Sequence, residues 1–304
     1  MHHAQAYLLL VSSAVGFGSM ALLSKLACQT YDGATVAGVR FAIGAAVTGL
    51  LWASGRVDAR PRHRNLLWLR GATGGIAVVL YFMSIERLSV GLATLLNYTS
   101  PAFTVFLARA FLGERVPRGG YVALGLTSLG VALVVFGKQD LGDAPPPDPV
   151  WVGLALLSAV FSSGAIVSVR ALRSRPEPET VWSIFLAFCV VGVVCAAPMS
   201  RGLHTPNPTE LALLLGVGAT AMGAQLGMNA VMRWVPAALF GITAQLAVVF
   251  TLVLGALWLD EPWSLTSATG AAVTLAGVAL AGYAHRPRDG AGSTPAGQFP
   301  QRQQ

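Results

Sequence analysis

Long apolar runs dominate this sequence and restrict it to a bundle of membrane-spanning helices. A bilayer core about 30 Å thick is crossed by about 20 residues of apolar helix. Charged residues are 11% of the chain, whereas soluble domains have roughly 25%, so a soluble fold is excluded. Runs of the required length occur ten times, at Tyr7–Leu26, Ala34–Ala53, Leu66–Ile85, Ser89–Leu112, Gly119–Gly137, Val150–Ala171, Thr180–Met199, Thr209–Val231, Pro236–Leu259 and Thr266–Ala284.

The lysines and arginines predict which ends of these runs face the cytoplasm, because cytoplasmic loops of membrane proteins are enriched in both residues. If both termini are cytoplasmic, fourteen basic residues fall on that side and four on the other. The fourteen are Arg56, Arg60, Arg62, Arg64, Arg70, Arg115, Arg118, Arg170, Arg173, Arg175, Arg233, Arg286, Arg288 and Arg302, and the four are Lys25, Arg87, Lys138 and Arg201. We therefore predict an all-α membrane protein with ten spans, located in the cell membrane. The net charge of +7 is spread over short gaps, which argues against a nucleic-acid partner.

The two halves of the chain resemble each other in sequence. Matching segments are Ser13-Ala14-Val15 with Ser158-Ala159-Val160, Lys25 with Arg170, Glu114 with Glu261, and Gly130-Val131-Ala132-Leu133 with Gly277-Val278-Ala279-Leu280. Each half holds five runs, so the second half must enter the membrane in the opposite sense. Inverted repeats of this kind are common in secondary transporters, whose substrate site lies between the two copies.

This repeat divides the chain into four predicted parts. Residues 1–138 and 150–284 form the two five-helix repeats. Residues 139–149 are acidic and proline-rich, and we expect an extracytoplasmic linker. Residues 285–304 are rich in glycine, proline and glutamine, a composition typical of a disordered tail.

Two motifs and one arginine connect the chain to a known family. They are Asn97-Tyr98-Thr99-Ser100-Pro101 followed by Phe111-Leu112-Gly113-Glu114-Arg115, a weaker copy at Trp258-Leu259-Asp260-Glu261-Pro262, and Arg40. In these residues the chain resembles the drug/metabolite transporter superfamily, in its EamA-like ten-helix branch. The resemblance covers about residues 7–284. It implies two inverted five-helix repeats around a central cavity that moves small metabolites across a cytoplasmic membrane, often outward.

The second copy of the motif departs from the first. Val248 stands where the first half has Pro101, and Ala244-Gln245 where it has Asn97-Tyr98. We therefore expect the two halves to line the cavity differently.

Charged residues within the spans are few, and each is a functional candidate because burying a charge in lipid is costly. Arg40 is the one clear cation expected at membrane depth, where it would clamp a carboxylate or phosphate. The alternative is a structural pair with Glu86 or Asp32. Glu114 and Glu261 lie at span ends, and we expect helix-end anchors or gate contacts there. No carboxylate falls at mid-membrane, which favours uniport or exchange over a proton relay through a buried acid.

Uncharged polar residues are the stronger candidates for a solute site. Pro101 leaves the carbonyl of Asn97 without its helix partner, so we expect a broken helix and a hinge at this point. Such irregular backbone is tolerated in a membrane only against protein or a water-filled cavity. The alternative role for these polar side chains is hydrogen bonding between helices. The candidate solute-binding residues are Asn97, Tyr98, Ser100, Gln245, Tyr81, Gln225, Asn229 and Arg40.

The sequence thus predicts a secondary-active or facilitative transporter of a small organic metabolite such as an amino acid. We expect it to act as an exporter by alternating access, with the solute and the bilayer as partners and a monomer sufficient. An integral membrane enzyme and a non-transporting scaffold are the alternatives. The enzyme is disfavoured because the sequence shows no catalytic triad, phosphate-binding loop or metal-ligand spacing, and no cofactor or metal is expected.

Overall fold

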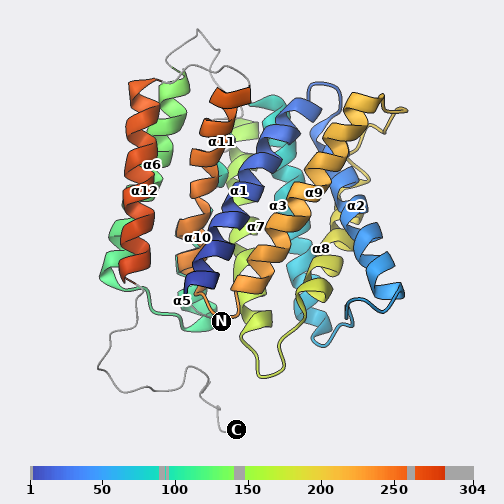
Figure 1. The fold of residues 1–304 in the computed structure, drawn as a ribbon, viewed down its shortest axis with the longest axis horizontal. Helices are drawn as coiled ribbons and strands as arrows, with labels where there is room; N and C mark the ends of the chain where they lie inside the picture. Colours follow the sequence, from blue (N-terminus) through green and yellow to red (C-terminus); the bar gives the residue numbers. More distant parts are fainter. Residues whose placement is uncertain (1–2, 89–92, 94–95, 140–147, 259–263, 285–304) are drawn as a thin grey trace.

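The computed structural model describes residues 3–88, 93, 96–139, 148–258 and 264–284. Its described elements are all α-helices (Figure 1). They are α1 (His3–Ala27), α2 (Gly33–Ala53), α3 (Arg64–Arg87), α5 (Ser100–Leu112), α6 (Arg118–Gln139), α7 (Pro149–Arg173), α8 (Val181–Ala196), α9 (Pro208–Val231), α10 (Ala237–Ala244), α11 (Leu246–Trp258) and α12 (Leu265–Ala284).

Six helices are long and apolar enough to cross a membrane, namely α1, α2, α3, α7, α9 and α12. Shorter apolar helices, including α5, α8 and α10, lie among them. The predicted all-α membrane protein is confirmed at this level.

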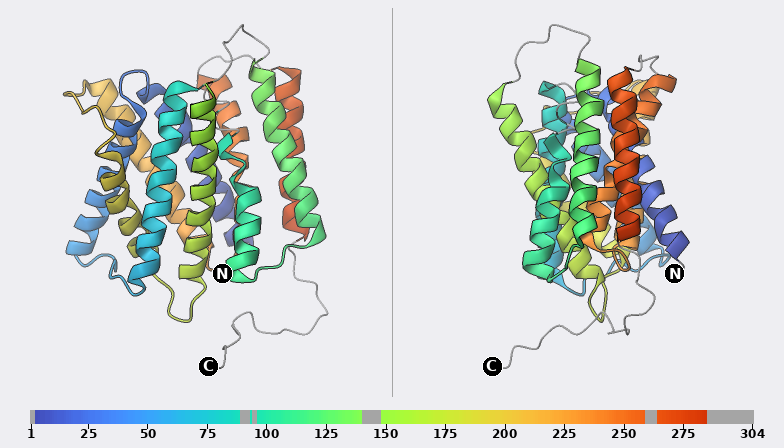
Figure 2. Two further views of the ribbon diagram at one scale, coloured as in Figure 1. Left: turned by 180° about the vertical axis from the view of Figure 1, so that it is seen from behind. Right: turned by 90° about the vertical axis from the view of Figure 1, so that its left-hand side faces the viewer.

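The helices stand side by side in one bundle (Figures 1 and 2). We call the end at which α1 begins the N-terminal end of the bundle; α12 ends there as well. The pair α6 and α12 lies at one side of the molecule, and α2 and α8 lie at the other. Between these sides, α1 packs on α9 and α3 packs on α7.

The fourth and ninth predicted runs are both interrupted. In the fourth, the chain turns at Tyr98 and Thr99 before α5 begins at Ser100, with Pro101 in its first turn. In the ninth, α10 ends at Ala244 and α11 starts at Leu246, with Gln245 between them.

The two interruptions have the same hydrogen bonding. In the first, the Thr99 amide donates to Leu96 O over 3.2 Å, and Thr99 O accepts from Ala102 N over 3.1 Å. In the second, Gln245 N donates to Ile242 O over 3.3 Å, and Gln245 O accepts from Val248 N over 3.1 Å. All four bonds span three residues, the tighter 3₁₀ pattern that often marks a hinge within a helix.

The pair α6 and α12 is held by reciprocal glycine contacts. A methyl group on Gly130 would lie 2.6 Å from Gly270 O, and one on Gly277 would lie 3.1 Å from Ala123 O. Small residues at such crossings let two helices approach closely in a membrane. Thr274 also lies against Gly130, and Thr127 against Gly277. The match between the Gly130 and Gly277 segments thus has a structural counterpart.

Two serines at matching sequence positions make matching contacts. Ser13 Oγ on α1 donates to Ala224 O on α9 over 2.8 Å. Ser158 Oγ on α7 donates to Ala77 O on α3 over 2.9 Å. All four groups lie in helices that pack a segment of the first half on a segment of the second.

Candidate functional site

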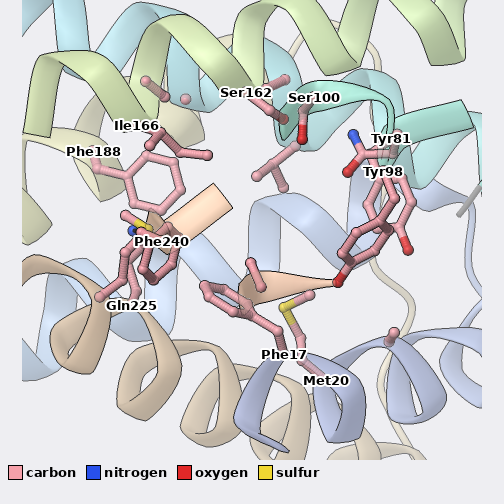
Figure 3. Close-up of a pocket in the computed structure, with 18 of the residues that line it drawn as sticks. Phe17, Met20, Tyr81, Tyr98, Ser100, Ser162, Ile166, Phe188, Gln225 and Phe240 are labelled. Atoms are coloured by element: carbon pink, nitrogen blue, oxygen red, sulfur yellow. Dashed lines mark hydrogen bonds between the residues drawn. The ribbon is translucent and has the colours of Figure 1, made fainter. Parts of the chain in front are cut away.

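A cavity of about 150 Å³ lies among helices from both halves of the chain (Figure 3). Its walls combine apolar and polar side chains. The main apolar ones are Phe17, Met20, Ile166, Phe188, Met228 and Phe240, and the polar ones are Arg40, Arg70, Tyr81, Asn97, Tyr98, Ser100, Ser162, Gln225 and Thr251. A mostly apolar cavity with a few convergent polar groups is typical of a small-molecule site.

Six of the predicted residues come together on this cavity wall: Arg40, Tyr81, Asn97, Tyr98, Ser100 and Gln225. Two other predicted residues are buried and do not line it. The Gln245 side chain is fully buried at the turn between α10 and α11. Asn229 Nδ2 donates to Val181 O over 3.3 Å, which ties α9 to the start of α8. Asn229 therefore makes a hydrogen bond between helices, the alternative role of these polar side chains.

The turn before α5 is fixed to α7 by hydrogen bonds. Asn97 Nδ2 donates to Ser158 Oγ over 2.7 Å, and that hydroxyl donates onward to Ala77 O. The carbonyl of Ser100 accepts from Ser163 Oγ over 2.8 Å. The interrupted backbone therefore faces protein hydroxyls on one side and the cavity on the other.

Aromatic rings stand at both ends of the cavity. Tyr81 and Tyr98 lie together at one end, and Phe188 lies at the opposite end, near Gln225 and Phe240 (Figure 3). Aromatic and amide groups in this arrangement can enclose an amphipathic organic solute.

Arg40 is buried on α2 and reaches the cavity wall. Its Nη1 lies 3.0 Å from Met20 Sδ, and its guanidinium carbon lies 5.9 Å from the centre of the Phe188 ring. Among the described residues no ion pair joins Arg40 to Glu86 or Asp32, the structural alternative, and both carboxylates bind other groups.

The two carboxylates have partners at the end of the bundle away from the N-terminus. Glu86 accepts from Gly33 N over 3.1 Å and lies 3.5 Å from Arg87. Asp32 caps α2 by accepting from Thr35 N and Thr35 Oγ1 over 2.9 and 2.6 Å. Burial raises the pKa of Asp32, but these bonds outweigh it and bring the pKa below its ordinary value.

Arg70 is a functional candidate that the sequence analysis missed. It was assigned to the cytoplasmic basic residues, but α3 begins at Arg64, so Arg70 lies within the helix and is 1% exposed. Arg40 is therefore not the one buried cation. The position of Arg70 inside the apolar run Leu66–Ile85 was the signal that should have identified it.

Glu114 joins three elements at the N-terminal end of the bundle. Its Oε1 accepts from Arg170 Nε on α7 over 2.7 Å, and its Oε2 accepts from Ala237 N at the start of α10 over 3.0 Å. Arg170 Nη1 also donates to Met232 O over 2.8 Å. Gly113, whose φ of 65° suits glycine, ends α5 and places Glu114 there.

Two further predictions concern the gate and metals. Pro101 packs near Gly241, where α5 contacts α10, whereas Glu261 lies outside the described residues. Within the residues that the structure covers, no three His, Cys, Asp or Glu side chains cluster as metal ligands.

Known proteins resemble the chain over nearly its full length. The EamA-like transporter family matches residues 4–136 and again 149–283. The pseudopaline exporter CntI of Pseudomonas aeruginosa is 30% identical over 278 residues, which cover 90% of this chain and 94% of that protein. Human solute carrier family 35 member G1 is 24% identical over 199 residues, 63% of this chain and 54% of that one. A solved crystal structure matches in fold, with a TM-score of 0.77 and 19% identity over 91% of this chain and 96% of that one.

Proposed function

The chain belongs to the EamA-like transporter family and is a membrane transporter, not an enzyme, and we propose that it exports a small organic metabolite such as an amino acid by alternating access. The observation that carries this proposal is the cavity walled by both halves of the chain. The relative from Pseudomonas aeruginosa is an exporter, which supports the outward direction.

Two inverted five-helix repeats, residues 1–138 and 150–284, form the proposed architecture, with ten spans in total. Three reciprocal features support it. Gly130 and Gly277 exchange equivalent contacts between α6 and α12. Ser13 and Ser158 make equivalent bonds between the halves. The fourth and ninth spans share the same 3₁₀ turn. Inverted repeats allow alternating access, because one repeat can rock against the other around a central site.

Both termini of the proposed carrier face the cytoplasm of a cell membrane, with residues 139–149 outside and 285–304 inside. Moving Arg70 into a span leaves thirteen basic residues on the cytoplasmic side against four on the other. That bias still supports the orientation. A monomer contains the whole cavity, so no second copy is needed for carriage.

In the proposed cycle, the six cavity-lining residues contact the solute, and the Glu114 contacts hold the N-terminal end closed. When the halves rock, the Arg170 pair and the Ala237 cap must separate, while Pro101 and its turn absorb the change as a hinge. Glu261 matches Glu114 in the repeat and is proposed as its counterpart at the other end.

The distribution of acids supports uniport or exchange. Among the described residues, aspartate and glutamate lie at helix ends or in loops, for example Asp32, Glu86, Glu114 and Glu179. A proton relay through a transmembrane acid therefore has no carrier within that part of the chain.

Flux in sealed liposomes tests the proposal. Purified protein is reconstituted with a panel of metabolites, beside protein-free liposomes, an Asn97→Ala variant and a Thr269→Ala control on the exposed face of α12. We expect saturable flux of some members of the panel, a reduced rate for Asn97→Ala and an unchanged rate for Thr269→Ala. Equal flux with and without protein across the panel would refute carriage and favour a non-transporting scaffold.

A further inference from the structure

We propose that Arg40 and Arg70 together form an anion-binding subsite in the cavity, and that the transported solute carries a carboxylate held there. This inference rests on the proposed carrier function and specifies its substrate class. It combines a residue that the sequence pointed to with one that only the structure places at the cavity.

The two arginines converge from opposite ends of the membrane-spanning region. Arg40 lies about two turns into α2, and Arg70 about two turns into α3, two helices that enter the bundle at opposite ends. Their guanidinium carbons lie 5.9 and 4.2 Å from the centre of the same Phe188 ring, at the middle of α8. Two cations thus share one patch of cavity wall.

Within the part of the chain that the structure describes, neither cation forms an ion pair with an acid. Arg40 contacts the sulfur of Met20 and three aromatic rings. Nε and Nη1 of Arg70 are buried with no hydrogen-bond partner among the described residues. Membrane proteins normally pair buried charges with opposite ones. Here two arginines without an acidic partner in the described part of the chain lie at a cavity, where the carboxylate of a bound ligand would supply the missing negative charge. The planar guanidinium matches a carboxylate with two parallel hydrogen bonds.

The subsite belongs to one half of the molecule. In the second half, α8 and α9 occupy the places in the repeat that α2 and α3 occupy in the first, and they contain no lysine or arginine. A purely architectural role would be expected to recur in both copies, as the contacts of Gly130 and Gly277 do. The asymmetry therefore favours recognition of a solute.

The cavity also gives the solute an orientation. The arginines surround Phe188, and Figure 3 shows Tyr81 and Tyr98 at the opposite end. A bound carboxylate at the Phe188 end would direct the remainder of the solute toward the tyrosine rings and the Asn97 amide. An organic acid with an apolar or weakly polar body fits this arrangement.

Matched pairs of probes test the subsite. Each pair has one carbon skeleton and differs only in carboxylate or carboxamide: phenylalanine with phenylalaninamide, and 3-phenylpropionate with 3-phenylpropanamide. Flux in liposomes and the thermal shift of the purified protein are measured for the wild type, Arg40→Gln, Arg70→Gln and Arg70→Met. Arg201→Gln is the control, because that side chain is 68% exposed in the loop between α8 and α9.

We expect the wild type to prefer the carboxylate of at least one pair by tenfold or more, and that solute to raise its melting temperature. Arg40→Gln and Arg70→Gln should reduce the preference at least tenfold and abolish the shift, whereas Arg201→Gln should change neither. Arg70→Met should melt at or above the wild-type temperature, since it removes an unpaired buried charge.

The inference fails if the wild type shows no carboxylate preference in any pair, or if both glutamine variants keep the wild-type preference. It also fails if Arg70→Met is much less stable than the wild type, because that result would indicate a structural role. If the wild type moves no solute at all, the proposed carrier function fails at that step, and the thermal shift still decides whether the arginines bind carboxylates.

Discussion

Ser158 joins separate segments of the site through its hydroxyl group. Its hydroxyl accepts from Asn97 and donates to Ala77 O, so it connects the interrupted fourth span with α7 and α3. Ser13, its match in the first half, donates one hydrogen bond, to Ala224 O. The two serines therefore provide a comparison between a site residue and its structural equivalent.

Ser158→Ala should destabilise the protein more than Ser13→Ala does. It removes two hydrogen bonds, those with Asn97 Nδ2 and Ala77 O, whereas Ser13→Ala removes one, and each such bond contributes about 0.5–1.5 kcal/mol. Thermal unfolding of purified protein measures the difference, with Ser12→Ala on the exposed face of α1 as the control. Equal melting temperatures for Ser158→Ala and Ser12→Ala would contradict the assigned contacts.

Single residues differ in how much the sequence reveals about them. Pro101 predicts a broken helix, and for that reason Asn97, Tyr98 and Ser100 were predicted as cavity residues. Arg70 was missed because it was assigned to a loop by its charge, whereas its neighbours in the apolar run decide its depth. Gln245 was expected to contact the solute, but which face of a turn a side chain takes depends on tertiary packing, and no local pattern encodes it.

At the scale of helices, the α6–α12 pair is the clearest case of sequence determining a contact. Glycine at positions 130 and 277 removes the Cβ atoms that would otherwise collide with the facing backbone. The interrupted spans are a partial case. Proline predicts the turn before α5. The turn at Gln245 has no proline or glycine next to it, so no local sequence pattern predicts that interruption.

Gly130→Ala and Gly277→Ala should each destabilise the protein by about 1–3 kcal/mol, the range typical of overpacking in a tight contact. Gly125→Ala is the matched control, since Gly125 lies on α6 with Gly130 but has no atom within 4 Å of the added methyl group. Melting temperatures of the three variants test this. A Gly130→Ala protein as stable as Gly125→Ala would show that α6 and α12 do not pack as described.

Glu114→Gln should loosen the N-terminal end of the bundle. The amide retains the size of the carboxylate but loses the charge that faces Arg170 at 2.7 Å, a pair whose side chains are only 18% and 15% exposed. Asp58→Asn is the control, because the Asp58–Arg62 pair is exposed and such pairs contribute little.

The measurement for Glu114→Gln is the rate at which a maleimide modifies a cysteine introduced at cavity residue Ser162 from the side of the N-terminal end. We expect a faster rate in Glu114→Gln and an unchanged rate in Asp58→Asn. Equal rates in all backgrounds would exclude Glu114 from the closure of that end.

For the whole molecule, composition and charge distribution were enough to predict an all-helical membrane protein, whereas its family was indicated by resemblance, through the Asn97–Pro101 and Phe111–Arg115 motifs. The central cavity was predicted as a consequence of the repeat, but its wall could not be assigned in detail. Side chains from at least eight helices meet there, and their depth and rotation depend on long-range packing. Arg70, Gln245 and Asn229 are the residues at which this limit is visible.

The proposed orientation places Arg62 in the cytoplasm and Arg201 outside. In a variant lacking Cys28, Cys189 and Cys195, Arg201→Cys in intact cells should react with an impermeant maleimide, and Arg62→Cys should react only after permeabilisation. Both side chains are exposed, so access of the reagent depends on sidedness. The opposite pattern would invert the topology.

Access to the cavity from both sides of the membrane is the most direct test of carriage by this molecule. Ser162→Cys in the cysteine-free background is reconstituted in one orientation in sealed vesicles, and an impermeant maleimide is applied either inside or outside. The account predicts modification from each side, slowed in both cases by a transported solute. Modification from one side alone, or from neither, would contradict alternating access through this cavity.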